Sequence, residues 1–173
     1  ACPIEQIWVS DGLKPGELDF QPQEGTGPLG YMVQNRHMRL AVQDVVAAHR
    51  DLIHLHMPAK AVDIVRDAHR ATVTLDTGEI LTAPLMVVAE GRFSPTREAE
   101  QFGLASWDYH HVALVGQITH ETPHDNIAYE IFYPDGPFAI LPMEDLNGKH
   151  RSAYVFTVPK AKADAYKKLG DRG

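Results

Sequence analysis

The stretch LMVVAEGRFSPTR, residues 85–97, decides the fold class, because its apolar first half predicts a buried strand that runs into a glycine turn. The turn carries a carboxylate at Glu90, a hydroxyl at Ser94 and a guanidinium at Arg97. Gly91 lets the backbone approach a pyrophosphate closely, and hydroxyl and guanidinium groups hydrogen-bond phosphate oxygens. The stretch therefore predicts a nucleotide-contacting loop. The alternative is a plain hairpin exit with a solvated charge cluster.

The composition is that of an ordinary globular protein of one domain's length, with 173 residues, 44% of them hydrophobic and 23% charged. The net charge of -7 and the dispersed basic residues argue against nucleic acid as a partner, because phosphate binding requires a basic stripe. Small molecules or proteins are the expected partners. No apolar run reaches the ~18 residues that span a bilayer. The single cysteine, Cys2, excludes an internal disulfide and fits a reducing cytoplasm.

The hydrophobic pattern predicts many strands and few helices. Apolar side chains recur at helical spacing from Asn35, a candidate N-cap, to His49. One helical turn is expected at residues 98–102 and a closing helix at 160–169. Strands are expected at residues 4–9, 52–57, 61–66, 71–75, 80–88, 109–120, 127–133, 138–142 and 152–158, with tight turns at 76–78 and 134–137 and a loop at 10–30. The composition changes near residues 104–108, which predicts a domain boundary there.

The loop at residues 85–97 resembles the second flavin fingerprint of the aromatic-ring hydroxylases, a strand followed by Asp-Gly-x-x-Ser-x-x-Arg, with Glu90 in place of the aspartate. Further segments resemble the ubiquinone-biosynthesis branch of these FAD-dependent monooxygenases, in the family's order. They are residues 30–36, 111–115, 121–124, 128–132 and 134–143. The family's Gly-x-Gly-x-x-Gly turn for the ADP half of FAD and its later Gly-Asp motif are not visible, so the chain is expected to be an internal fragment.

The resemblance implies an α+β, β-rich fold with a mixed or antiparallel sheet, taken from a two-domain FAD- and NAD(P)-binding α/β enzyme. Residues 1–104 would be a partial FAD-binding region that lacks the N-terminal βαβ unit and contains a three-strand meander. Residues 105–173 would be part of the substrate-binding sheet. The implied reaction is hydroxylation of a polyprenylated phenol with FAD, NAD(P)H and O₂. The cofactor carries that chemistry, so no catalytic acid, base or nucleophile is expected in this chain.

The resemblance also implies roles for individual residues. Arg36, at the start of the helix, would lie beside the flavin together with the residues of the 85–97 loop. The substrate-facing sheet would present Tyr129, Phe132, Phe138 and Pro142, for which plain core is the alternative. The isolated fragment is expected to be inactive, to bind no FAD and to self-associate through unpaired strand edges and the apolar helix face at residues 38–46. The parent enzyme is expected in the cytoplasm, with peripheral membrane contact.

Two motif matches are rejected. Residues 25–30, GTGPLG, satisfy the dinucleotide pattern, but no buried strand precedes them and Pro28 removes a backbone donor. Residues 120–124, HETPH, satisfy a zinc-protease pattern, but Pro123 would interrupt the required helix. The two imidazoles are therefore expected at a strand end and turn, in directions that do not suit zinc. His54 and His56 supply only two ligands, so no metal is expected. The rival hypothesis is a non-catalytic β-rich domain for small-molecule binding or interaction.

Overall fold

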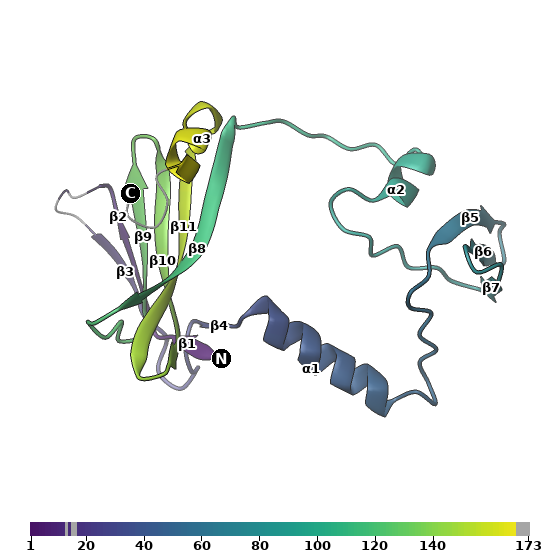
Figure 1. The fold of residues 1–173 in the computed structure, drawn as a ribbon, viewed down its shortest axis with the longest axis horizontal. Coiled ribbons are helices and arrows are strands. Elements are labelled where there is room, and N and C mark those ends of the chain that lie inside the picture. The colour runs from purple at the N-terminus through teal and green to yellow at the C-terminus, as the bar shows by residue number, and fades with distance from the viewer. Residues whose placement is uncertain (13, 15–16, 169–173) are drawn as a thin grey trace. The chain divides into compact units, whose positions relative to one another are not determined.

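The computed structural model describes residues 1–12, 14 and 17–168, and the chain divides into two units. Unit 1 contains Ala1–Gln43 and Trp107–Gly173, and unit 2 contains Asp44–Ser106. Figure 1 shows that strands dominate unit 1, whereas unit 2 has a small meander and long connections. Each unit is described by itself.

Unit 1 is built around a six-stranded sheet in the order β3-β2-β9-β10-β11-β8. Its strands are β2 (Gln6–Ser10), β3 (Glu17–Phe20), β8 (His111–His120), β9 (Ile127–Tyr133), β10 (Gly136–Leu146) and β11 (Lys149–Pro159). All neighbours are antiparallel except β2 and β9, which run parallel. The predicted β-rich fold with a mixed sheet is confirmed.

The long strands β9, β10 and β11 follow one another directly because short turns join them. Leu146 pairs with Lys149, and the two residues between them, Asn147 and Gly148, have φ of 54° and 75°. Asn-Gly is the preferred pair for such a turn, whose twist matches that of the flanking strands. The turn at residues 134–135 joins β9 to β10, as the sequence predicted.

The register assigns each strand residue to one of two faces, because directly opposed residues share a face and neighbours along a strand alternate. Face B carries Phe156 and is covered by α3 (Lys160–Lys168), whose Tyr166 ring lies edge-on 5.1 Å from the Phe156 ring. The fully buried residues Val158, Pro142 and Ser152 lie on this face. Ala128, Ala139, Met143 and Ala153 on the opposite face are also buried, so the core of unit 1 includes residues from both faces of the sheet.

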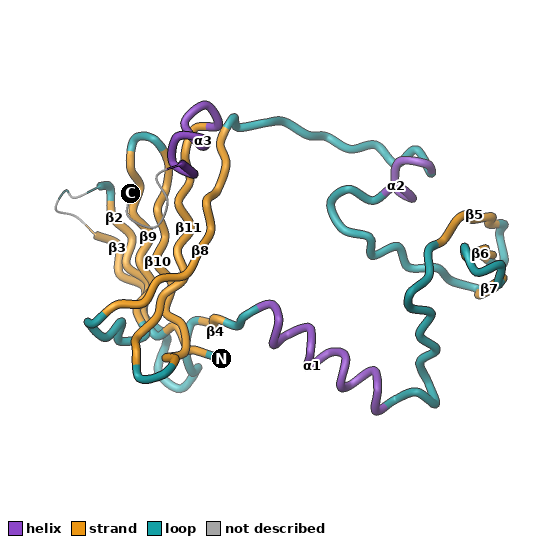
Figure 2. The backbone as a smooth tube through the Cα atoms, viewed as in Figure 1, coloured by secondary structure: helices purple, strands orange, loops and turns teal. Residues whose placement is uncertain are grey.

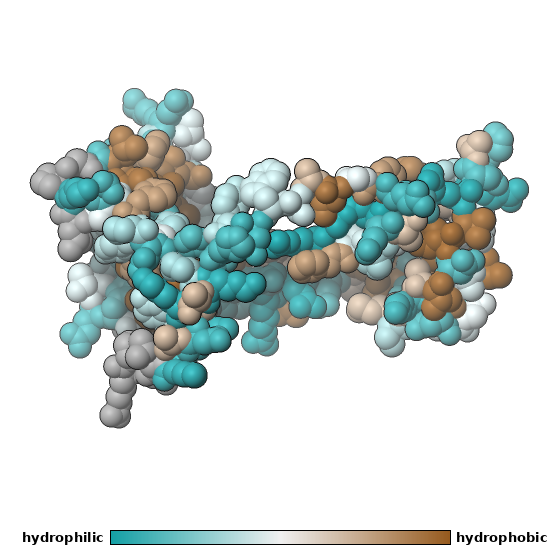
Figure 3. Space-filling view, turned by 90° about the horizontal axis from the view of Figure 1, so that it is seen from above, coloured by the Kyte–Doolittle hydropathy of each residue, from teal (hydrophilic) through white to brown (hydrophobic). Residues whose placement is uncertain are grey.

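Face A, the opposite face, carries Val155 and is open over β8 in the described chain. A row of directly paired residues crosses it from β2 to β8: Val9, Glu130, Ala139, Val155 and Val115. Val115 is 69% exposed, and large apolar side chains reach the surface in both units (Figure 3).

A short two-stranded sheet precedes the first helix. β1 (Cys2–Ile4) pairs antiparallel with β4 (Gly30–Met32), and α1 (Asn35–Ala48) begins shortly after β4. The predicted helix is confirmed, but Asn35 is its first helical residue and not its N-cap, because the first helical N–H, that of Met38, donates to the Gln34 carbonyl oxygen at 3.2 Å. No residue of α1 is buried by the described chain, so its apolar side chains stand in the open.

Unit 2 contains the predicted three-strand meander, β5 (Ala61–Arg66), β6 (Ala71–Leu75) and β7 (Ile80–Ala83), and the short helix α2 (Pro95–Ala99). The strand predicted at residues 52–57 is wrong, and the strand predicted at 80–88 is confirmed only as far as Ala83. Residues 52–57 and 85–88 are loop, as Figure 2 shows on either side of the meander. Pro84 cannot donate to a ladder and ends β7, and neither segment has a paired neighbour among the described residues.

Three smaller differences concern other boundaries. The predicted loop at residues 10–30 contains β3, which forms by pairing with β2. The expected helical turn at residues 98–102 is shifted to α2, because Pro95 at the first turn favours an earlier start. The closing helix ends at Lys168 in the described chain, and residue 169 lies outside it.

The predicted division into residues 1–104 and 105–173 stays a prediction about the roles of the two parts. The strand pairing adds one fact to it: β2 lies in the same sheet as β9, so residues 6–10 share a sheet with residues 127–133. No helix in the described part of the chain is long and apolar enough to cross a membrane.

Gly136 gives a test of the hairpin geometry. It has a φ of 143°, and a Cβ at this position would lie 2.5 Å from the Thr157 carbonyl oxygen. Because a backbone atom cannot move aside cheaply, we expect Gly136→Ala to lower the free energy of unfolding by about 2 kcal/mol or more. Urea unfolding measures this. Gly30→Ala, where a Cβ meets nothing within 4 Å, is the control, and equal stability of the two variants would contradict the prediction.

Candidate functional site

The predicted nucleotide loop is organised around the Glu90 carboxylate, which accepts three hydrogen bonds. The Ser94 hydroxyl donates at 2.5 Å, the Thr96 hydroxyl at 2.9 Å and the Thr96 backbone N–H at 3.1 Å. These bonds lower the pKa of the Glu90 carboxyl below its ordinary value of 4.5, with the Ser94 bond as the largest cause. Glu90 therefore closes the loop upon itself. The sequence did not single out Thr96, because only the folded turn brings its hydroxyl and N–H to Glu90.

Ser94 has a second structural task as the N-cap of α2. Its oxygen accepts the Arg97 N–H at 3.1 Å while its own hydrogen is directed at Glu90, and the side chain is only 6% exposed. The hydroxyl is thus fully engaged within the loop. Its predicted contact with a phosphate stays a prediction.

The groups of the loop that remain accessible to a ligand are guanidinium groups and the backbone at Gly91. One Arg97 guanidinium nitrogen donates to the Arg92 carbonyl oxygen at 2.6 Å, and guanidinium has five N–H donors in all. The Arg92 guanidinium lies 5.3 Å from the centre of the Phe93 ring. Gly91 has a φ of 85°, and nothing lies within 4 Å of a Cβ built there. An anion can therefore approach the loop at Gly91 and Arg97.

A cavity of about 360 Å³ lies within unit 1, on face A beside the start of α1. Sheet residues Val115, Gln117 and Ala153 form one side of it, and the segment between β4 and α1 forms another. Arg36 does not line this cavity, but its neighbours Asn35 and His37 do. Arg36 is exposed, and its side chain has no hydrogen bond or ion pair with a described residue.

The four aromatic and proline candidates lie on different faces. Phe132 is on face A and is 49% exposed. Tyr129 and Phe138 are on face B, where their rings pack edge-on against Trp8 and Phe156 at 5.8 and 5.6 Å. Pro142 is fully buried on the same face. Alternation is visible in the sequence, but which face is covered is not, so the sequence could not separate Phe132 from the other three.

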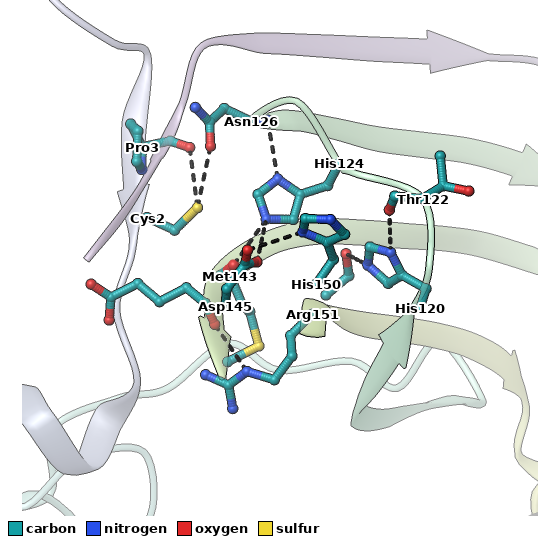
Figure 4. A network of polar contacts seen from close by, with 12 residues as sticks. Cys2, Pro3, His120, Thr122, His124, Asn126, Met143, Asp145, His150 and Arg151 are labelled. Atoms are coloured by element: carbon teal, nitrogen blue, oxygen red, sulfur yellow. Dashed lines mark hydrogen bonds and ion pairs between the residues drawn. The ribbon is translucent and has the colours of Figure 1, made fainter. Parts of the chain in front are cut away.

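Three histidines, His120, His124 and His150, gather at the end of β8. The ring centroids of His120 and His124 lie 6.2 Å apart, and both lie within 6.3 Å of His150 (Figure 4). Asp125 and Asn126, with φ of 49° and 60°, turn the chain back after His124. The expected strand end is confirmed, since β8 stops at His120.

The nitrogens of these rings are largely occupied by the protein itself. His124 Nε2 lies 2.9 Å from the Met143 carbonyl oxygen, and its Nδ1 accepts the Asn126 N–H at 3.1 Å. His120 Nε2 lies 2.9 Å from the Ser152 hydroxyl, and His150 Nδ1 lies 3.0 Å from Asp145 (Figure 4). No group of the described residues has the arrangement of a metal site. The cluster fastens the turn after β8 to β10 and β11.

No family model matches the chain. Ubiquinone hydroxylase UbiL of Rhodospirillum rubrum is 38% identical over 155 residues, which are 90% of this chain and 35% of that protein. Ubiquinone hydroxylase UbiM of Neisseria meningitidis is 31% identical over 174 residues, 96% of this chain and 36% of that protein. The chain spans about a third of the length of these curated relatives.

The fold is also found in a solved structure. PqsL, described as a probable FAD-dependent monooxygenase from Pseudomonas aeruginosa, matches 96% of this chain and 48% of its own with a TM-score of 0.68 at 16% identity. The chain therefore has a fold that occurs within FAD-dependent monooxygenases. By sequence it is similar to ubiquinone hydroxylases over 90% or more of its own length, in agreement with the resemblance of residues 85–97 and the further segments.

The hydrogen bonds to the Glu90 carboxylate predict a pH titration that can be measured at a neighbouring amide of the loop. Because the pKa of the folded-state carboxyl is depressed, its contribution to stability is complete above its unfolded pKa and is lost as pH falls through the folded value. We expect the Thr96 amide proton shift to titrate with a midpoint below 4.5, measured by NMR between about pH 2.5 and 6.

The variant Glu90→Gln should abolish this titration and speed hydrogen exchange of the Thr96 and Arg97 amides by about tenfold, because a charge-assisted acceptor becomes a neutral one. The control is Glu98→Gln, which alters a carboxylate in the same short helix outside the network. A Thr96 titration that persists in Glu90→Gln would contradict the assignment.

Proposed function

We propose that this chain is part of a flavin-dependent monooxygenase that hydroxylates a polyprenylated phenol in ubiquinone biosynthesis, using FAD, NAD(P)H and O₂. The observation that carries the proposal is the 38% identity with a ubiquinone hydroxylase over 90% of the chain. Identity at this level, spread over both units, is unlike the short-motif matches that were rejected above. It favours the enzyme over the non-catalytic rival.

The 85–97 loop fits the phosphate part of FAD in a way that differs from the sequence prediction. Arg97 and the open backbone at Gly91 would contact the anion, whereas Glu90 and Ser94 would hold the loop in shape from within. The longer side chain of Glu90 supports this division, because it reaches over to the start of α2. Arg36 would approach the cofactor from the start of α1. Once bound, FAD supplies the redox chemistry with O₂.

Face A supports a role as the surface that meets the aromatic substrate. It is open, largely apolar and adjoins the cavity beside Val115 and Ala153. Phe132 would contribute to this surface directly. Tyr129, Phe138 and Pro142 would act from face B by fixing the sheet's shape. The protein's contribution to the reaction would be to orient the ring and exclude water.

The chemistry of the proposed substrate also bears on where the complete enzyme works in the cell. A polyprenyl tail partitions into the bilayer, at about 0.8 kcal/mol for each buried CH₂ group. The complete enzyme would therefore work in the cytoplasm and touch the membrane peripherally to reach this tail. NAD(P)H would serve as its reductant.

The test uses the complete gene product, incubated with NAD(P)H, ¹⁸O₂ and a short-chain polyprenylphenol. We expect a flavin absorbance band and a product with one labelled oxygen, detected by mass spectrometry. Arg97→Ala should lose most of its flavin on dialysis, because a charge-assisted phosphate contact is removed. The control Arg70→Ala removes a guanidinium from the β5–β6 turn of the same unit. A complete protein without flavin or product would overturn the proposal.

The 173-residue chain alone is expected to bind no FAD and to self-associate. The six-stranded sheet ends in β3 and β8, and Val115 on β8 is largely exposed. On α1, Met38, Val42 and Val45 are also exposed. Such edges and apolar surfaces favour pairing with another copy. Sedimentation velocity at micromolar concentration should show species heavier than 19.2 kDa, and a clean monomer would contradict the expectation.

A further inference from the structure

Glu130 is a charged residue in the middle of an apolar surface. It lies on β9, the third strand of the sheet, and its side chain belongs to face A. Its directly paired neighbours are Val9 on β2 and Ala139 on β10, and the row continues to Val155 and Val115. Every other member of this row is aliphatic. The sequence pattern alone gave no reason to single out the glutamate.

The Glu130 carboxyl has no partner among the described residues, although it is half-buried. No hydrogen bond or ion pair with them involves its side chain. Glu100, the other half-buried glutamate of the described residues, is paired: 22% of its side chain is exposed, and it binds Arg66. On face B, the buried hydroxyl of Ser152 is likewise bonded, to His120. A half-buried carboxyl without a donor is costly, which indicates a position suited to an incoming group.

Burial alone raises the pKa of the Glu130 carboxyl above its ordinary value, since no neighbouring charge contributes. This agrees with the geometry, because a carboxyl that faced a protein cation would be shifted the other way. An acceptor in such surroundings binds a neutral O–H donor more strongly than the same acceptor does in water. The apolar residues around it favour an aromatic ring that carries this donor.

We propose that Glu130 recognises the ring hydroxyl of the phenolic ligand, with the ring lying on the aliphatic row of face A. This rests on the proposed function for the substrate class, and it adds the residue that orients the ring. The Glu130 carboxyl accepts the hydrogen bond from the phenol, while Ala139 and Val155 support the ring from below. Small side chains at these two positions leave room for a flat group beside the carboxyl.

The geometry makes the hydroxyl a directional anchor. A ring held only by apolar contacts can turn in its plane, whereas one hydrogen bond to a fixed strand residue selects a single edge. Glu130 is fixed because both of its neighbouring strands are paired through it. It would therefore decide which ring carbon is presented for hydroxylation, and it would be a binding residue rather than an acid or base.

The experiment compares phenol with anisole, which has the same ring but no O–H donor. Each is titrated into the ¹⁵N-labelled complete gene product, and amide shifts of Ala139, Val155 and Val9 are followed by NMR. We expect phenol to bind about tenfold more tightly than anisole, as one well-placed hydrogen bond allows. In Glu130→Leu this preference should vanish, with anisole binding unchanged or tighter. Glu130→Gln, which keeps a carbonyl acceptor, should retain part of it.

The control is Glu17→Gln, which removes a carboxylate from β3 on the opposite face of the same sheet. Its preference for phenol should equal that of the unaltered chain. If Glu130→Leu fails to fold, the test is the ¹³C resonance of the Glu130 carboxyl in the unaltered chain. Phenol should shift this resonance and anisole should not.

Equal affinity for phenol and anisole in the unaltered chain, or a preference that survives in Glu130→Leu, would overturn the role of Glu130. The proposed function is separately judged by hydroxylation in the complete protein. Hydroxylation without the preference would reject Glu130 alone, whereas the preference without hydroxylation would reject the monooxygenase and keep the phenol site.

Discussion

The register of β11 with its two neighbours is the constraint on which the rest of unit 1 depends. β11 pairs with β10 on one side and with β8 on the other, and each pair fixes which side chains share a face. Because side chains alternate, a slip of one residue would exchange the covered face with the open one. Val158 on β11 would then lie on the other face, and Glu130 and Ala139 would keep their places while losing the part of the row that continues to Val155 and Val115.

The polar groups on the two faces of the sheet differ in whether they have hydrogen-bond partners. Face B is covered by α3 over β8 and β11, and its hydroxyl at Ser152 is bonded within the histidine cluster that fastens the turn after β8. Face A is open and mostly aliphatic, and it carries one carboxyl without a protein partner among the described residues. Burial without a partner destabilises a fold, so a polar group left in that condition is better explained by binding than by stability.

The sequence predicts what is local and fails where a distant partner decides. Strands β8 to β11 and the meander were predicted because short turns join them, and Asn147-Gly148 has the chemistry of its turn. Residues 52–57 and 85–88 have the pattern of strands, but a strand requires a paired neighbour, and they have none in the described chain. β3 was missed for the converse reason, since its pairing with β2 forms it within a segment of loop composition.

The candidate site shows the same limit of sequence-based prediction for individual hydrogen bonds. Glu90, Gly91, Ser94 and Arg97 do form one loop, yet the sequence does not tell that the carboxylate and the hydroxyl bind each other. That bond engages both groups within the loop, so under our proposal the motif supplies two ligand contacts, the Arg97 guanidinium and the Gly91 backbone, and two supporting side chains. Replacing the family's aspartate with Glu90 is tolerated on this view, because a supporting carboxylate must only reach Thr96, and the added methylene helps it to do so.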